Sequence, residues 1–469
     1  MGHKKQHLML HSVMEGSSLL ETPTGSTLFG CPPEILKQIL FQKLPIPNSI
    51  VLPAKLYRRH CSQAAIEFVF FYYLFIHNGL EKYGKFRIFG TNSQCRLLKE
   101  SIRIVLIGPT EKEICEQGMP KQLAVQLSKE MQYMALQNPK TNQNYTVDEV
   151  LDWNVLEVGQ QSPLYPTTKD FSEIQLKRKG KSAYQVVTAK KSIDINLSFR
   201  KKQHPVYPIQ HKAAKRTPDQ LSLTILGNSD GFDPKNPANG YLFNFNNRLG
   251  IWDCPNYLHV QLKKLKIKFD QIEAIVLSHV HEDHLDVAES IRKDNPIDLF
   301  CTPEVYYSFL LKVQALMNCS HQKAKKYHRW HPISIDKPYS ILGASFQFFY
   351  SVHAIPAVGS HITVGPKNQK KTILISGDHA PFGLIREMKE AGVLPETRFN
   401  EAINLIQGHE DLILIDAGGG TIHGNYEDYL QTEKSIHFMH TGELPIKLPE
   451  SKSLVKHGQV IDLNSLSSY

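Results

Sequence analysis

Two kinds of hydrophobic periodicity divide the chain. From Leu221 onward, short apolar runs of strand length alternate with stretches in which apolar residues recur at helical spacing. The runs LSLTILG, YLFNF and LGIWDC predict three strands, and a helix is expected at 257–265. Later strands are expected at 297–302, 340–353, 361–364, 371–376, 411–416 and 435–439, with helices at 285–293, 303–317, 382–391, 396–406 and 425–431. Strands that pair locally and then interleave with helices predict two sheets packed face to face, with helices outside.

The first half of the chain has a weaker pattern. Residues 1–30 show no sustained period, so no regular structure is expected there. Helices are predicted at 34–41, 92–107 and 120–136, and strands at 49–52, 184–189 and 192–199. The most apolar run, 66–76, is shorter than the ~20 residues that span a bilayer as a helix, so it predicts a buried element and no membrane association. No internal repeat is apparent.

Length and charge suggest how the chain is organised. With 469 residues, it exceeds an ordinary single domain, and the change of rhythm predicts an N-terminal α/β region at 1–217 and a second domain at 218–469. The net charge of +9 is concentrated between Lys177 and Arg216, a segment with twelve Lys or Arg residues and only one acidic residue, Asp194. This basic segment, 177–216, is interpreted as a solvated hairpin and linker, or as a path for a polyanion such as nucleic acid.

Cysteines and short motifs exclude several classes of protein. The seven cysteines form no CxxC pair, so the sequence predicts neither a thiolate zinc site nor a disulfide framework. The N-terminus lacks the apolar core of a secretory signal, and a cytoplasmic location is expected. No Walker-type loop, GxGxxG or GxSxG is present, so nucleotide-binding and serine-hydrolase functions lack their basic parts.

The most informative stretch is SHVHEDHLD at 278–286. A short apolar run, 273–277, precedes it and predicts a buried strand that ends at the motif. His279 and His281 are two residues apart, so in extended backbone they point to the same side, while the chain turns to present Asp283 and His284. Imidazole and carboxylate groups at this spacing predict a site for two borderline metal ions.

Two metal ions need more ligands than one motif supplies. Further His or Asp residues were therefore sought at the ends of downstream strands, where His279 also lies. His353 ends SFQFFYSV, Asp378 ends KTILISG as a candidate bridge between the ions, and His440 ends SIHFM. Asp253, at the end of LGIW, is placed to orient a ligand histidine or to cap a turn.

These motifs resemble those of the metallo-β-lactamase superfamily over residues 218–469. SHVHEDHLD resembles the HxHxDH signature, and HAIPAVG followed by ILISGDH is similar to motifs of the branch that contains ribonuclease Z and related phosphodiesterases. The resemblance implies an αβ/βα four-layer sandwich with an N-terminal α/β extension. It assigns His279, His281 and His353 to one ion and Asp283, His284 and His440 to the other, with Asp378 bridging. Zinc is the expected metal, with manganese or iron as alternatives, and a homodimer is expected from the family.

The chain also departs from that family. The residue after the bridging aspartate is His379 in place of threonine or serine, and LILIDAGGGTIHG stands where ribonuclease Z has its HEAT-type motif. Asp416 and His423 are then loose replacements for that motif's proton-donating pair. The catalytic candidates are accordingly Asp283 and, as general acid, His379 or His423. No element resembling the tRNA-grasping arm of ribonuclease Z is present.

The sequence thus predicts a dinuclear-metal phosphodiesterase. Its substrate would be a nucleotide, a cyclic nucleotide or RNA, attacked by a hydroxide that bridges the metals. Hydrolysis of a thioester, lactone or amide, or iron-dependent sulfur oxidation, fits the same ligand set. A third hypothesis assigns the function to an interaction module at 1–217.

Overall fold

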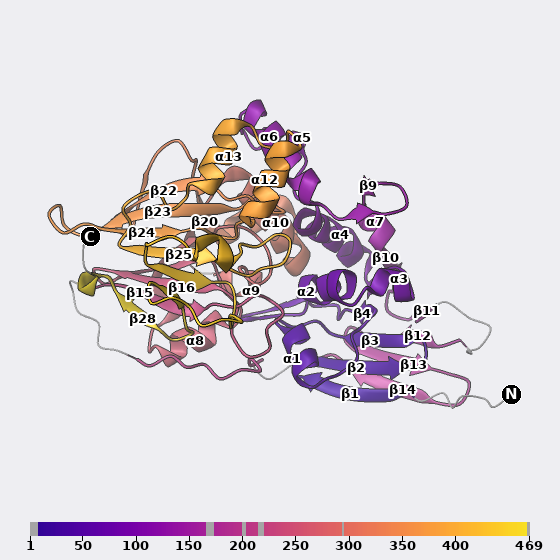
Figure 1. The fold of residues 1–469 in the computed structure, drawn as a ribbon. Helices are drawn as coiled ribbons and strands as arrows, with labels where there is room; N and C mark the ends of the chain where they lie inside the picture. The colour runs from indigo at the N-terminus through magenta and orange to yellow at the C-terminus, as the bar shows by residue number, and fades with distance from the viewer. Residues whose placement is uncertain (1–7, 166–172, 199–202, 214–219, 293–294, 467–469) are drawn as a thin grey trace. The chain divides into compact units, whose positions relative to one another are not determined.

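The computed structural model (Figure 1) describes residues 8–165, 173–198, 203–213, 220–292 and 295–466. The chain forms two compact units that interleave along the sequence. Unit 1 comprises Met1–Ile102, Tyr145–Val206 and Leu311–Ser320, and unit 2 comprises Arg103–Asn144, Tyr207–Leu310 and His321–Tyr469. The domain boundary expected at residue 217 stays a prediction.

Unit 2 contains two seven-stranded sheets. The first has the order β20-β19-β18-β17-β16-β15-β28. Its early strands β15, β16 and β17 pair antiparallel, and β17 to β20 pair parallel. The strands are β15 Leu221–Gly227, β16 Gly240–Phe245, β17 Arg248–Trp252, β18 Ile272–Val276, β19 Ile297–Cys301, β20 His328–Pro332 and β28 Val460–Asp462. Parallel pairing places the ends of β17 and β18 at one edge, where the metal motif begins.

The second sheet follows the same plan in the later part of the chain. Its order is β21-β22-β23-β24-β25-β26-β27, antiparallel up to β24 and parallel afterwards. The strands are β21 Tyr339–Ile341, β22 Ala344–Tyr350, β23 Val358–Val364, β24 Lys371–Ile375, β25 Leu412–Asp416, β26 Ile436–Met439 and β27 Lys452–Leu454. Figure 1 shows this sheet as a layer next to β15 and β16.

The inner faces of the two sheets form one hydrophobic core. Phe243 and Trp252 of the first sheet are fully buried in it, as are Phe346 and Ile373 of the second. The ring of Phe243 lies edge-on to Phe346, with 5.8 Å between the ring centroids. The apolar alternation along each strand is therefore explained by burial between the sheets.

Helices cover the outer faces of the sandwich. They are α8 Leu258–Lys264, α9 Val287–Ser290, α10 Pro303–Met317, α12 Phe382–Glu390 and α13 Glu396–Ile403. Unit 2 also includes α5 Glu111–Glu116 and α6 Lys121–Met134 from the first half of the chain. Leu127 and Met131 of α6 join the core of unit 2, and α6 itself agrees with the helix predicted at 120–136. The four-layer αβ/βα arrangement is confirmed.

Unit 1 has a six-stranded sheet with the order β1-β2-β3-β4-β7-β10 and a four-stranded antiparallel sheet with the order β11-β12-β13-β14. The first sheet contains β1 Met9–Met14, β2 Ser17–Thr22, β3 Gly25–Phe29, β4 Ser49–Val51, β7 Phe86–Gly90 and β10 Leu151–Val155. The second contains β11 Gln161–Pro163, β12 Gln175–Arg178, β13 Ala183–Val187 and β14 Ser192–Asn196. The helices include α1 Ile35–Phe41, α2 Glu67–Phe71, α3 Gly79–Tyr83, α4 Asn92–Leu106 and α7 Val147–Val150. This agrees with the expected α/β extension.

Three expectations need correction or refinement. Residues 9–29 form strands β1 to β3 because tight turns at 15–16 and 23–24 pair short strands whose weak alternation hid them. The helix expected at 285–293 is only the four-residue α9, and 425–431 contains a 3₁₀ turn, Tyr426–Tyr429. Among the described residues, no helix is long and apolar enough to cross a membrane.

Candidate metal centre

The metal motif is held in place by its neighbours in the first sheet. Strand β18 ends at Val276, and Ser278 donates two hydrogen bonds, from its backbone N and its Oγ, to Oδ1 of Asp253 at 2.8 and 2.7 Å. The backbone of Cys254 accepts from Asp286 N and donates to the carbonyl of His284. The motif therefore forms a turn that is fixed at both ends against the end of β17.

One group of potential ligands combines the motif with the second sheet. His279, His281, His353 and Asp378 each offer an atom, and these atoms lie within 4.8 Å of one another. His353 Nε2 is 3.1 Å from His281 Nδ1, and His279 Nε2 is 3.5 Å from Oδ2 of Asp378. The ends of β18, β22 and β24 thus meet at one point, as the sequence predicted.

A second group lies beside the first and shares Asp378. Asp283, His284 and His440 form this group. His440 Nε2 is 3.2 Å from Asp283 Oδ2 and 3.1 Å from His284 Nε2. The two oxygens of Asp378 face different histidines, since Oδ1 is 3.1 Å from His284 Nε2 and Oδ2 is 3.4 Å from His440 Nε2. The structure therefore brings together all seven residues predicted to be ligands.

Unsatisfied polar atoms test whether metal ions fit this cluster. His279 Nε2 and both oxygens of Asp378 are buried without a hydrogen-bond partner. Buried polar atoms without a partner are rare because each costs about 1–3 kcal/mol. Imidazole nitrogens and a shared carboxylate are ligands suited to zinc and similar divalent ions. The donor set and its unpaired atoms therefore fit two divalent cations, and the identity of the metal stays a prediction.

The cluster concentrates charge in a buried space. Burial lowers the pKa of His279 and of His353 well below the usual value, so both imidazoles are neutral and able to ligate. Burial also acts to lower the pKa of His284, but the carboxylates of Asp378, Asp283 and Asp253 outweigh it and raise that pKa well above its usual range. A buried site that pairs carboxylates so closely with histidines has a strong preference for added positive charge.

Two further groups orient ligand histidines. Asp253 Oδ2 accepts a hydrogen bond from His284 Nδ1 at 2.7 Å, which leaves Nε2 facing the cluster. The placement expected for Asp253 is therefore found. His281 is oriented from another direction, because its Nε2 donates to the backbone carbonyl of Val105 at 3.2 Å. The first half of the chain thus reaches the metal centre through the end of α4.

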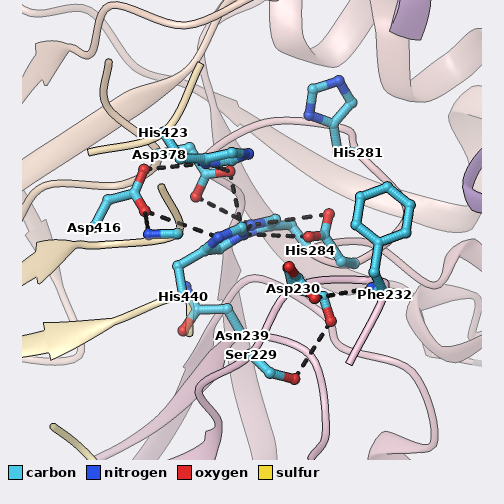
Figure 2. Close-up of polar contacts among 12 residues, drawn as sticks. Ser229, Asp230, Phe232, Asn239, His281, His284, Asp378, Asp416, His423 and His440 are labelled. Carbon is cyan, nitrogen blue, oxygen red and sulfur yellow. Dashed lines mark hydrogen bonds and ion pairs between the residues drawn. The ribbon is translucent and has the colours of Figure 1, made fainter. Parts of the chain in front are cut away.

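Asp416 and His423 lie at the rim of the centre (Figure 2). His423 Nδ1 is 3.1 Å from Asp416 Oδ2, and its ring stacks on His440 with 4.4 Å between centroids. The backbone N–H groups of Gly418 and Gly424 also donate to Asp416. Burial acts to lower the pKa of His423, but Asp416 outweighs it and the net shift is upward. His423 is also close enough to Asp378 and His440 to act as a ligand.

His379 does not join the cluster. Its Nδ1 accepts from the backbone N of Val352 at 3.2 Å, and its Nε2 faces the carbonyl of Ala402 at 3.0 Å. Burial lowers the pKa of this histidine to about 4, so it is neutral at physiological pH. Both ring nitrogens bond the backbone, so the expectation that His379 serves as a general acid is corrected. Its position after Asp378 suggested the role, and its packing against α13 prevents it.

A loop for which the sequence predicted no role also borders the metal centre. Residues 228–239 connect β15 to β16, and Asn228 Nδ2 donates to the carbonyl of Thr441, next to His440, at 3.1 Å. Figure 2 draws Asp230, Phe232 and Asn239 of this loop in one view with His284 and His440. Asp230 Oδ1 accepts from the backbone N of Phe232 and of Asp233, at 2.9 Å each, which makes a tight turn. The run of Asn, Asp, Gly and Pro in this loop was the available signal, because such loops commonly line sites.

The chain is similar to a known protein family and to two curated proteins. Residues 221–437 match the family model described as Anti-Pycsar protein Apyc1. The cGMP-dependent 3′,5′-cGMP phosphodiesterase A of Dictyostelium discoideum is 30% identical over 209 residues, 44% of this chain and 23% of that protein. The cAMP/cGMP-dependent phosphodiesterase B of the same organism is 28% identical over 220 residues, 46% of this chain and 20% of that protein. The matched region is therefore about a fifth of each relative's length.

Solved structures with a similar fold cover about half of the chain. The metallo-β-lactamase fold protein YhfI from Bacillus subtilis covers 52% of this chain and 99% of its own, with 15% identity and a TM-score of 0.39. The short form of human tRNase Z covers 52% and 99%, with 18% identity and a TM-score of 0.38. A Zn²⁺-bound PqqB from Methylobacterium extorquens covers 52% and 100%, with 15% identity and a TM-score of 0.35.

Proposed function

We propose that this chain is a metal-dependent phosphodiesterase acting on nucleotides, with a metallo-β-lactamase-type metal centre in its C-terminal half. The observation that carries the proposal is the convergence of seven His and Asp side chains, with Asp378 between 3.1 and 3.5 Å from histidines of both groups. One group would hold one ion through His279, His281 and His353. The other would hold the second through Asp283, His284 and His440.

Cyclic nucleotides are the substrates that we favour within this class. The two relatives from Dictyostelium discoideum are named as phosphodiesterases of 3′,5′-cGMP or of 3′,5′-cAMP and 3′,5′-cGMP, and each matches a little under half of this chain. Both are named as phosphodiesterases, in line with the sequence-based preference for a phosphodiester. Linear nucleotides and RNA remain the alternatives within the same chemistry.

The residues of this chain would bind the metal ions, orient the ligand histidines and donate a proton in the reaction. When bound, a pair of divalent cations supplies a reactive water with a pKa lowered toward ~7 and positive charge for the phosphate. Asp378 fixes the spacing of the two groups, while Asp253 and the Val105 carbonyl hold the rings of His284 and His281. The attacked phosphorus gains a bond to the water oxygen and loses its bond to the leaving oxygen.

His423 is placed to protonate that leaving oxygen. Its Nδ1 is bonded to Asp416, and its Nε2 has no hydrogen-bond partner among the described residues. About a fifth of its side chain is exposed, at 19%, while the ligand histidines are buried. A proton donor must reach both the reacting atoms and solvent, which His423 does and His379 does not.

The test is turnover of 3′,5′-cyclic GMP, 3′,5′-cyclic AMP and bis(p-nitrophenyl) phosphate by the Zn²⁺- or Mn²⁺-loaded full chain. Asp283→Ala should abolish turnover of each, while Asp270→Asn, at an exposed carboxylate of the same unit, should leave it unchanged. A thioester and lactone panel run in parallel covers the other reactions of this fold. Turnover of those esters with no phosphodiester activity would overturn the proposal.

A further inference from the structure

The two units share one strand topology. In unit 1, β1, β2 and β3 pair antiparallel and β3, β4, β7 and β10 pair parallel. In unit 2, β15, β16 and β17 pair antiparallel and β17 to β20 pair parallel. Each series leads into antiparallel strands of a second sheet, β11 to β14 in unit 1 and β21 to β24 in unit 2.

The hairpin β2–β3 has the same register as the hairpin β16–β17. In unit 1, Ser18 pairs with Phe29 and Thr22 with Gly25; in unit 2, Tyr241 pairs with Trp252 and Phe245 with Arg248. Both hairpins therefore have the same length and a turn of two residues, Pro23-Thr24 in unit 1 and Asn246-Asn247 in unit 2. The next helices, α1 and α8, contain seven residues each, and the first helices after β7 and β19, α4 and α10, contain fifteen each.

Local bonds repeat as well. A Cys-Pro pair follows each hairpin, at Cys31 and at Cys254. The carbonyl of Cys31 accepts from Ala65 N at 2.9 Å, and that of Cys254 accepts from Asp286 N at 2.7 Å. The residue before each seven-residue helix has positive φ, 52° at Glu34 and 58° at Tyr257. The sequence showed no internal repeat, and the structure corrects this expectation. The repeat is visible in the strand topology and in these hydrogen bonds, whereas few residues are identical in the two units.

The two units differ at the edge where unit 2 carries its ligands. Between the equivalent bonds, unit 1 has the segment 52–64, LPAKLYRRHCSQA, in place of 277–285, LSHVHEDHL. The loop that contains His353 in unit 2 is reduced in unit 1 to Lys179-Gly180-Lys181-Ser182. Among the residues of unit 1 that the structure describes, no strands equivalent to β25 and β26 follow β14. Within the described residues of unit 1 alone, no three His, Cys, Asp or Glu side chains form a group able to hold a metal.

Lys and Arg side chains occupy this edge of unit 1, where unit 2 has its predicted metal ligands. Lys55 and Arg59 follow β4, Lys179 and Lys181 follow β12, and all four are exposed. The backbone N of Ala54 donates to the carbonyl of Lys181 at 2.8 Å, so the two segments meet. Neither 52–63 nor 178–183 contains an acidic residue. The two segments therefore carry cations only, while Glu157, after β10, is half-buried and accepts a hydrogen bond from the backbone N of Asn92 at 2.9 Å.

We propose that unit 1 is a second copy of the metal-binding fold whose ligand edge has become a cationic site for phosphodiester anions. Lysine and arginine attract a phosphodiester as the metal ions of unit 2 would, but they do not generate a hydroxide. Unit 1 therefore binds the anion without hydrolysing it. The choice of a phosphodiester as the anion rests on the function proposed for unit 2. The absence of metal from unit 1 is independent of that function.

Binding is measured by fluorescence anisotropy with fluorescein-labelled octauridylate, and by equilibrium dialysis with 3′,5′-cyclic GMP. The protein is the full chain with Asp283→Ala, which prevents hydrolysis of the probe. Adding Lys55→Glu and Lys181→Glu should weaken binding of at least one probe about tenfold, because two phosphate-contacting charges are reversed. The probe that responds identifies a polynucleotide or a mononucleotide as the source of the anion.

The matched control is Lys190→Glu with Lys191→Glu, two exposed lysines in the turn at the opposite end of β13. Equal weakening by both pairs, or no weakening by the first, would overturn the proposal. Elemental analysis supplies an independent readout. The wild-type chain should hold two metal ions, the number proposed for the cluster of unit 2; a third bound ion would contradict the absence of metal from unit 1. These readouts do not depend on turnover, so they stand whether or not unit 2 is a phosphodiesterase.

Discussion

The ring of His281 donates its Nε2 hydrogen to the main-chain carbonyl of Val105, 3.2 Å away. This bond fixes the tautomer in which Nδ1 is deprotonated, and Nδ1 is the atom that faces His353. Val105 lies outside the region matched by the family model, 221–437. A residue of the first half of the chain therefore takes part in organising a metal centre that belongs to the second half.

The carbonyl of Val105 is held by a network behind it. Arg103, on the same helix, bonds both oxygens of Glu113 at 2.6 and 3.2 Å, and Tyr307 donates to Glu113 at 2.6 Å. Burial acts to raise the pKa of Glu113, but Tyr307, Thr110 and Arg103 outweigh it and lower that pKa. Glu113 is therefore an ionised anchor between α10 and the end of α4.

Replacing this anchor should loosen the metal centre from a distance. We expect Glu113→Gln to weaken metal affinity roughly tenfold, because groups that orient ligand histidines commonly contribute 10–100-fold. The affinity is measured by competition with a chromogenic chelator. Glu116→Gln, at an exposed carboxylate one turn further along α5, is the control and should change nothing. Identical affinities for the two variants would show that Val105 needs no support from Glu113.

His423 should affect the rate of reaction more than metal binding. His423→Gln removes the proposed proton donor, and we expect kcat to fall about 100-fold, a typical loss for general acid catalysis. Metal content, measured by elemental analysis, should stay at the wild-type value. His437→Gln, at a histidine of β26 that bonds Ser453 instead of the cluster, is the control. If His423→Gln loses metal in proportion to activity, His423 is a ligand and the general acid lies elsewhere.

The sequence predicted which side chains converge because the ends of strands can be recognised in it. Each apolar run that stops at a His or Asp marks a position at the sheet edge, and the residues so marked, from His279 to His440, do converge. The same reasoning left two candidates for the general acid, His379 and His423. His379 also follows a strand, and only its bonds to Val352 and Ala402 separate it from His423.

Other features could not be read from the chain. The bond from His281 to Val105 joins residues far apart in sequence and involves a backbone carbonyl, which has no sequence signature. The strands at 9–29 were missed because short paired strands give little periodicity. The repeat between the two units was missed because topology persists where identities such as Cys31 and Cys254 are few.

The carboxylate of Asp253 should control the metal affinity of the second group. Asp253 has a φ of 64°, a conformation that asparagine also tolerates, so Asp253→Asn should fold normally. The variant loses the charge that faces His284 Nδ1, and we expect metal affinity to fall about 10–100-fold. Isothermal titration with Zn²⁺ measures the loss, and Asp270→Asn serves as the control. Unchanged affinity in Asp253→Asn would mean that hydrogen bonding by a neutral side chain is sufficient.

A buried histidine far from the metal cluster should make stability depend on pH. His328 lies edge-on to Phe309, and its Nε2 is 3.1 Å from the carbonyl of Ser290. Burial lowers the pKa of His328 to about 3, below the ~6.5 of an exposed histidine. Above pH ~6.5 both the folded and the unfolded chain are neutral at this position. As the pH falls toward 3, the unfolded chain gains a proton that the folded chain excludes, so stability is lost.

Between pH 7.5 and 5.5 this single group should remove about 1.4 kcal/mol from the free energy of unfolding. Urea denaturation of the wild type and of His328→Gln, both in excess chelator, isolates the effect from metal binding. We expect the wild type to lose that much more stability than the variant over this range, because glutamine does not titrate. His331→Gln, at an exposed residue of the same strand, should behave as the wild type does. Equal losses in wild type and His328→Gln would mean that the folded chain admits the proton at His328.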